Sequence, residues 1–207
     1  MRIKCWIAAV LFMLSLCSVC FAQEKVAALN DDIRGVEAFM EAFNQKAELY
    51  GRPVRLVSTG FIGGDAKQAY YSVKDNAKHW HMPLSVGTFG DDPRIKRLQL
   101  TIHIKGPYDG ADKEQELLGE FSLCFDTLLL SLTALGVPLD DARAHLQAVI
   151  MRSVDIPVHN LHQGQPAREE FLHDGKRFVI LVDHLTSESL RGAYHPFLSV
   201  DINAYER

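Results

Sequence analysis

A two-residue turn, Asp174-Gly175, constrains this 207-residue chain more than any other short segment. It stands between two runs of strand-forming residues, 167–173 and 176–183. An Asp-Gly pair in that position is the strongest short-range signal for a β-hairpin. The run 178–182 is continuously apolar, which is typical of a strand covered on both faces. The chain is therefore predicted to fold around an antiparallel sheet.

Further strands are indicated by apolar residues that alternate with polar ones. The clearest run is Arg97 to Lys105, and Phe197 to Asn203 repeats the pattern at the end of the chain. Two shorter strands are predicted at 54–59 and 67–73. The segment 79–89 is harder to assign, because Pro83 favours an edge strand over a central one.

Three helices are predicted from residues that recur at three- and four-residue intervals, at 33–50, 112–135 and 139–153. Asn30, Asp31 or Asp32 is expected to cap the first helix. The second is apolar nearly all round at 128–130, which favours a helix covered on more than one side. The fold class is therefore α+β, a largely antiparallel sheet packed with three helices in the order α-β(3–4)-α-α-β3.

The first 22 residues are typical of a cleaved secretory signal peptide. Arg2 and Lys4 precede an apolar run, and Cys20-Phe21-Ala22 supplies a small-x-small cleavage site. Two alternatives remain, an uncleaved membrane anchor and a lipoprotein lipidated at Cys17 or Cys20. Residues 23–207 are predicted to form a single α+β domain that is periplasmic or secreted, with no membrane span after cleavage.

Charge and cysteine content narrow the function of the mature chain. Removing Arg2 and Lys4 from the 22 basic residues leaves 20 against 26 acidic ones, a net charge of −6. An acidic protein is repelled by nucleic acid, so no nucleic-acid partner is expected. Of the four cysteines only Cys124 lies outside the signal, so no internal disulfide can form. Its place in an apolar helical stripe favours a buried structural thiol over a nucleophile.

Histidines offer the one candidate metal site, for zinc or copper. His79 and His81 flank Trp80, and His159 and His162 form a second pair three residues apart. Paired histidines at short spacing are common ligands of both metals. No cysteine or carboxylate completes either pair at a recognised spacing, so incidental surface histidines are the competing interpretation and no resident cofactor is predicted.

No catalytic motif is present, and the catalytic residues are unknown. The long polar connection 155–166 carries Asn160 and Gln163, which with Trp80 are candidate binding residues, because recognition often uses loops held by a rigid sheet. The predicted function is that of an exported binding or accessory protein without chemistry of its own, whose partner is a protein or a small ligand outside the cytoplasm. The alternative is a periplasmic metal-assisted hydrolase or metal-binding protein that uses the His79/His81 region.

Overall fold

The computed structural model describes residues 24–61, 68–75, 81–88, 91–103, 111–154, 159–160, 166–187 and 195–207. The predicted signal peptide lies outside these residues. In chain order the described elements are β1 (Val26–Ala27), α2 (Val36–Leu49), β2 (Val54–Phe61), β3 (Gln68–Asp75), β4 (His81–Gly87), β5 (Arg97–His103), α3 (Ala111–Ala134), α4 (Leu139–Val154), β6 (His159–Asn160), β7 (Ala167–His173), β8 (Lys176–Ser187) and β9 (His195–Tyr205).

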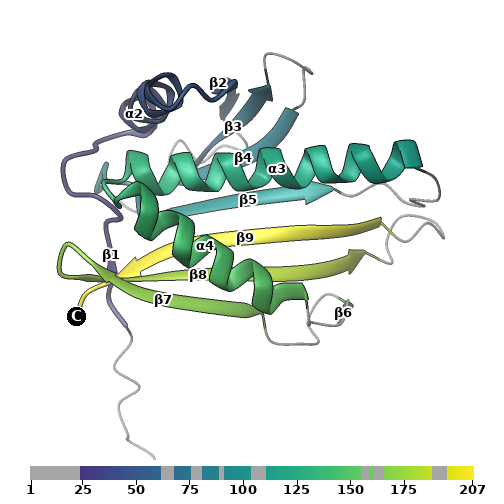
Figure 1. The fold of residues 1–207 in the computed structure, drawn as a ribbon. Coiled ribbons are helices and arrows are strands. Elements are labelled where there is room, and N and C mark those ends of the chain that lie inside the picture. Colours follow the sequence, from purple (N-terminus) through teal and green to yellow (C-terminus); the bar gives the residue numbers. More distant parts are fainter. Residues whose placement is uncertain are drawn as a thin grey trace, which may run out of the picture.

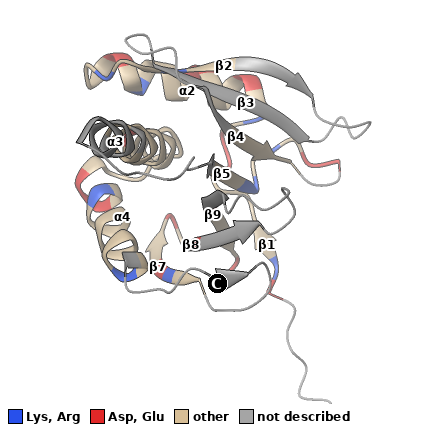
Figure 2. Ribbon diagram, turned by 90° about the vertical axis from the view of Figure 1, so that its right-hand side faces the viewer, with Lys and Arg blue, Asp and Glu red and all other residues tan. Residues whose placement is uncertain are grey.

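The described strands form one sheet in the order β2-β3-β4-β5-β9-β8-β6, with β1 paired to β9 and β7 to β8. Every pairing is antiparallel except that of β6 with β8. The long helix α3 packs on the sheet nearly in line with β5, between α2 and α4 (Figure 1). Seen along α3, the strands curve around it, so that the helices occupy the concave side (Figure 2).

The predicted α+β class and element order are confirmed, with four strands in the first block. The structure adds two strands of two residues each, β1 and β6, which are too short to give a periodic signal. The hairpin is also confirmed: Asp174 and Gly175 both have positive φ, 49° and 72°, as a type I′ turn requires, and His173 pairs with Lys176.

Two local predictions are wrong. The first helix begins at Val36 behind Gly35, not at the polar residues before it. Asn30 instead accepts hydrogen bonds from the backbone N–H groups of Asp32 and Ile33, and donates to the Leu135 carbonyl at 2.8 Å.

Pro83 does not make its strand an edge, because β4 lies between β3 and β5. The described β4–β5 ladder ends at the pair Leu84–Leu100, one residue after Pro83. Proline has no backbone N–H to donate. Because Pro83 lies beyond the end of this ladder, no hydrogen bond to β5 needs a donor from it.

The core lies between the helices and the concave face of the sheet. Alternate residues of the central strands supply it: Leu98 and Leu100 in β5, and Val200 and Ile202 in β9, are at most 1% exposed. The predicted burial of α3 on more than one side is confirmed, because three consecutive leucines, 128–130, are each at most 2% exposed. The helix contacts α2 and α4 as well as the sheet.

Candidate binding face

The candidate site is the convex face of the sheet, which we call the open face. In a strand successive side chains point to opposite sides, so the residues between the core positions of β5 and β9 belong to this face. No helix of the described chain covers it, since α2, α3 and α4 all lie on the concave side (Figure 2). Its side chains are therefore the ones that the sheet presents outward.

Four polar side chains at the centre of the open face form a hydrogen-bonded group that we call the polar ladder: Arg97 and Gln99 of β5, and Ser199 and Asp201 of β9. Arg97 Nε donates to Asp201 Oδ1 at 2.7 Å. Gln99 Nε2 lies 3.5 Å from Asp201 Oδ2 and 3.4 Å from Ser199 Oγ. The two strands are neighbours in the sheet, which is why these residues meet although about 100 positions separate them in the chain.

The ladder is half-buried rather than freely solvated. The Asp201 side chain is 18% exposed and that of Arg97 is 40% exposed, while Ser199 as a whole is 7% exposed. Mutual hydrogen bonds hold these groups in fixed positions. A partner that binds here therefore meets ordered donors and acceptors, and less side-chain entropy is lost on binding.

The open face continues across β8 and β7 into a group of ion pairs. Arg177 donates to Glu170 at 2.9 Å, pairs with Glu24 at 2.5 Å, and its guanidinium carbon lies 5.1 Å from the centre of the Tyr205 ring. Arg168 also pairs with Glu170. The hydrogen bond from Arg177 contributes most to holding the pKa of Glu170 below its ordinary value.

A second cluster lies on the helix side, where α4 packs on β7. His145 Nδ1 is 2.7 Å from Glu169 Oε1, and Arg152 pairs with the same carboxylate. The imidazole stacks on the Phe171 ring, with centroids 4.0 Å apart. Burial raises the pKa of Glu169, but the hydrogen bonds from His145 and Arg152 outweigh it, and the net pKa is lowered. This cluster ties α4 to an outer strand of the sheet.

The structure places two of the histidines of the predicted metal site, His81 and His159, on separate strands of the sheet. His81 lies in β4 and His159 in β6, with β5, β9 and β8 between them. At about 4.8 Å per strand, four steps across the sheet amount to roughly 19 Å of backbone separation. His79 and His162 lie outside the described residues, so a metal site at either pair stays a prediction.

Of the predicted binding residues, Asn160 lies in β6, where it pairs with Thr186 of β8. Trp80 and Gln163 lie outside the described residues. The role of these three residues in binding therefore also stays a prediction.

The polar ladder was not among the residues predicted to form a site. A signal for it exists, because Arg97 and Gln99 occupy the polar positions of one alternating run, and Ser199 and Asp201 those of another. Each run predicts a polar face by itself. The sequence does not show that the two runs are neighbouring strands of one sheet.

The prediction for Cys124 is confirmed. The residue is 2% exposed on α3, and burial raises the pKa of its thiol well above the ordinary value. Thiolate is the nucleophilic form, so this side chain is unreactive where it stands.

Comparison with known proteins gives no family: no protein-family model matches the chain, and no curated protein or solved structure is significantly similar to it. None of the described helices has both the length and the apolar character needed to cross a bilayer. Among the described side chains, no three His, Cys, Asp or Glu groups lie close enough together to hold a metal ion.

Proposed function

We propose that this chain is an exported binding or accessory protein, without covalent chemistry of its own, that holds a protein partner against the open face of its sheet. The observation that carries the proposal is the polar ladder, Arg97, Gln99, Ser199 and Asp201, on a face that no described helix covers. Such a set of ordered hydrogen-bonding groups favours recognition.

The shape of the face favours a protein over a small molecule as partner. Small-molecule sites are concave and bury most of the ligand. The open face is the convex side of a curved sheet (Figure 2), and it carries the polar ladder on β5 and β9 and charged side chains on β7, with Val179 and Leu181 of β8 between them. A broad convex surface matches the scale of a protein interface, about 800 Å² on each partner.

Charge supports the same assignment. The face carries both signs, with Arg97 paired to Asp201 and Arg177 paired to Glu170. A surface with both signs can complement opposite charges on a protein partner, and it differs from the continuous basic stripe that nucleic acids require. We place the encounter with the partner outside the cytoplasm, on the ground of the N-terminal signal sequence.

Site-specific photo-crosslinking tests the proposal. A photo-reactive residue is placed at position 99 in the native host, and a second strain carries it at position 45, a glutamine on the exposed side of α2. We expect irradiation to give an adduct of one defined mass from position 99 and none from position 45. The absence of an adduct at position 99, or the same adducts at both positions, would contradict the proposal.

A matched pair of substitutions measures the strength of the contact. Gln99→Arg adds a second cation beside Arg97 and breaks the ladder, whereas Gln45→Arg changes a solvated helix position. We expect Gln99→Arg to weaken the captured complex at least tenfold, which corresponds to about 1.4 kcal/mol, and Gln45→Arg to leave it unchanged. Equal affinity of the two variants would show that the partner binds elsewhere.

Export is tested separately. The proposal predicts that the protein recovered outside the cytoplasm begins at Gln23, as read by N-terminal sequencing. Recovery of the full-length chain from the membrane fraction would instead support an anchor, and a lipidated Cys20 would support a lipoprotein.

A further inference from the structure

We propose that the partner of the open face is a basic protein, and that an apolar patch on it binds the hairpin end of this face. The contact on this chain is a row of four residues across neighbouring strands, which we call the end row: Leu172, Arg177, Tyr205 and Val26. The inference rests on the proposed function, because it names the chemistry of the protein that the open face holds.

Strand register places the end row on the open face. Leu172 of β7 pairs with Arg177 of β8, and Arg177 pairs with Tyr205 of β9. Tyr205 in turn pairs with Val26 of β1. Residues that pair directly in an antiparallel sheet share a face. Ala204, the neighbour of Tyr205 in β9, is buried in the core, so the four side chains of the row belong to the opposite face.

The end row is continuous with the polar ladder. Arg97 of the ladder pairs with Asn203 of β9, and Tyr205 stands two residues after Asn203 on the same strand. Tyr205 and Arg97 are therefore diagonal neighbours on one face, at positions within reach of long side chains. A protein that covers the ladder can cover the end row in the same interface.

Exposed aliphatic side chains form the two ends of the row. Val26 is 44% exposed and Leu172 is 59% exposed. Apolar residues that are exposed singly are common on protein surfaces and need no explanation. These two flank an arginine and an aromatic ring in one row, so together they offer an apolar contact surface.

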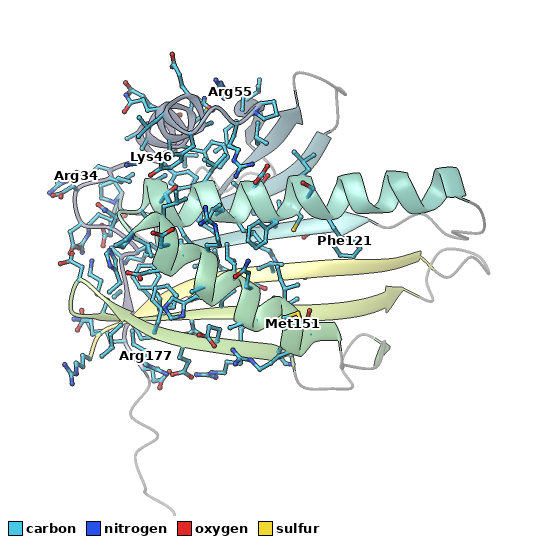
Figure 3. The ribbon with its side chains drawn as sticks, in the orientation of Figure 1. Arg34, Lys46, Arg55, Phe121, Met151 and Arg177 are labelled. Atoms are coloured by element: carbon cyan, nitrogen blue, oxygen red, sulfur yellow. The ribbon has the colours of Figure 1, made fainter. Side chains whose placement is uncertain are left out.

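The centre of the row is ordered before any partner binds. The guanidinium carbon of Arg177 lies 5.1 Å from the centre of the Tyr205 ring, within the range of a cation–π interaction. Glu170 and Glu24 pair with the same guanidinium, which lies near the hairpin (Figure 3). Arginine and tyrosine are enriched among the residues that carry most of the binding energy of protein interfaces. An ordered pair also loses less side-chain entropy when a partner binds.

Charge indicates that the partner is basic. The Glu24 side chain is 56% exposed, whereas the Arg177 side chain that it pairs with is 25% exposed, so the carboxylate is the more accessible charge beside the row. From Gln23 onward the chain carries 26 acidic and 20 basic residues. A negative protein attracts a positive partner and increases the rate of their encounter. The contact surface of the partner is therefore an apolar patch with lysine or arginine beside it.

Crosslinking at a second position of the open face tests the end row. A photo-reactive residue is placed at position 172 in the native host, and a matched strain carries it at position 49, a leucine of α2 that is 70% exposed. We expect position 172 to give an adduct of the same mass as position 99, and position 49 to give none. An adduct at position 99 without one at position 172 would overturn the end row and leave the proposed function intact. No adduct at either position would contradict both.

The adduct also reports the chemistry of the partner. Mass spectrometry should place the link from position 172 in a segment that contains apolar residues and carries net positive charge. The complex should be about threefold weaker in 1 M NaCl than in low salt, because salt screens the attraction between opposite charges. A linked segment with net negative charge, or a complex that salt does not weaken, would overturn the basic partner.

A matched pair of uncharged substitutions measures the apolar contact. Leu172→Gln removes the aliphatic side chain from the end row, and Leu49→Gln makes the same change on α2. We expect Leu172→Gln to weaken the captured complex about tenfold and Leu49→Gln to leave it unchanged. Both positions are exposed, so both variants should unfold at the temperature of the unchanged protein, which separates loss of the contact from loss of the fold. Equal affinity of the two variants would overturn the end row whatever the crosslinking at position 99 gives.

Discussion

Two outer strands of the sheet, β2 and β7, are protected in chemically different ways. Each pairs with a single described strand, β3 and β8 respectively. An outer strand presents unpaired backbone N–H and C=O groups, which can pair with a strand of another chain. At β2, Asn44 of α2 accepts the Leu56 N–H at 2.8 Å and donates to the Leu56 carbonyl at 3.1 Å. The Asn44 amide therefore satisfies two backbone groups that a further strand would otherwise pair with.

Arg55 extends this protection of β2. Its guanidinium donates to the carbonyls of Val54 and Arg52, both at 2.8 Å. Figure 3 places Arg55 beside β2, at the upper end of the molecule, far from Arg177 near the β7–β8 hairpin. The outer side of β2 is thus occupied by side chains that bond to its backbone.

The strand β7 is protected by charge. Three consecutive charged residues, 168–170, belong to it, and all three form ion pairs. Glu169 binds His145 and Arg152 on the helix side, and Glu170 binds Arg177 on the open face. Ion pairs of carboxylates depend on pH and salt, whereas the amide bonds of Asn44 depend little on either. The two edges are therefore expected to respond differently to acid, salt and substitution.

The largest effect is expected from Asn44→Ala. It leaves both backbone groups of Leu56 without the amide, and Leu56 is only 3% exposed. An unsatisfied buried polar group costs about 1–3 kcal/mol, so the free energy of unfolding should fall by about that amount in urea titrations. The exposed backbone of β2 should also make the variant self-associate, which sedimentation velocity measures.

Gln45→Ala is the control for Asn44→Ala, because it truncates the next residue of the same helix at an exposed position. It should change stability by less than about 0.5 kcal/mol and leave the protein in its original association state. If Asn44→Ala resembles Gln45→Ala in both measurements, the amide does not protect β2.

At β7, Glu169→Gln should lower stability at pH 7 by about 1–2 kcal/mol, because it removes the charge that His145 and Arg152 contact. The pKa of Glu169 is lowered in the fold from an ordinary value of 4.5. The stability that comes from this lowering is present above pH 4.5 and is lost as the pH falls toward the folded-state pKa. The difference in unfolding free energy between the two proteins should therefore shrink as the pH falls below 4.5, and a difference that grows as the pH falls would contradict this.

The fold was predictable from the sequence because its signals are local. The alternation of apolar and polar residues predicts β5 and β9, and the Asp-Gly turn fixes the register of β7 with β8. The start of α2 was missed because Asn30 has a nonlocal role, binding the Leu135 carbonyl 105 residues away. Pro83 misled the prediction because its effect depends on where the β4–β5 ladder ends.

The candidate site was less predictable than the fold. Arg97 and Asp201 belong to strands 104 residues apart in sequence, and nothing in either run identifies the other as its neighbour. Spacing in the sequence grouped His159 with His81, whereas β5, β9 and β8 lie between their strands in the sheet. Strand order arises from packing of the whole chain, so it was not available from periodicity.

Asp126, a carboxylate near β2, is expected to change the stability of the fold with pH in the opposite direction to Glu169. Burial raises the pKa of Asp126 on α3, and its contact with Arg52 at 3.5 Å only partly offsets this. The ionised form is therefore unfavourable in the fold, and stability is lost as the pH rises above 3.8. Asp126→Asn should raise the free energy of unfolding at pH 7 by less than about 1 kcal/mol, and this gain should disappear below pH 3.8. Destabilisation at pH 7 would show that the Arg52 contact dominates.

The smallest effect is expected from Arg168→Ala on the open face of β7. The Arg168 side chain is 50% exposed, and its partner Glu170 keeps the hydrogen bond from Arg177. Exposed ion pairs contribute about 0.2–1 kcal/mol, and salt screens them. The variant should therefore lose no more than about 0.5 kcal/mol of unfolding free energy in low salt and match the unchanged protein in 1 M NaCl, as followed by urea unfolding at both salt concentrations.

Asn44→Ala is the control for this salt dependence. It should lose the same unfolding free energy at both salt concentrations, because the hydrogen bonds that it removes join an uncharged amide to the backbone. A salt-independent loss in Arg168→Ala would mean that the aliphatic part of its side chain, and not its charge, protects β7.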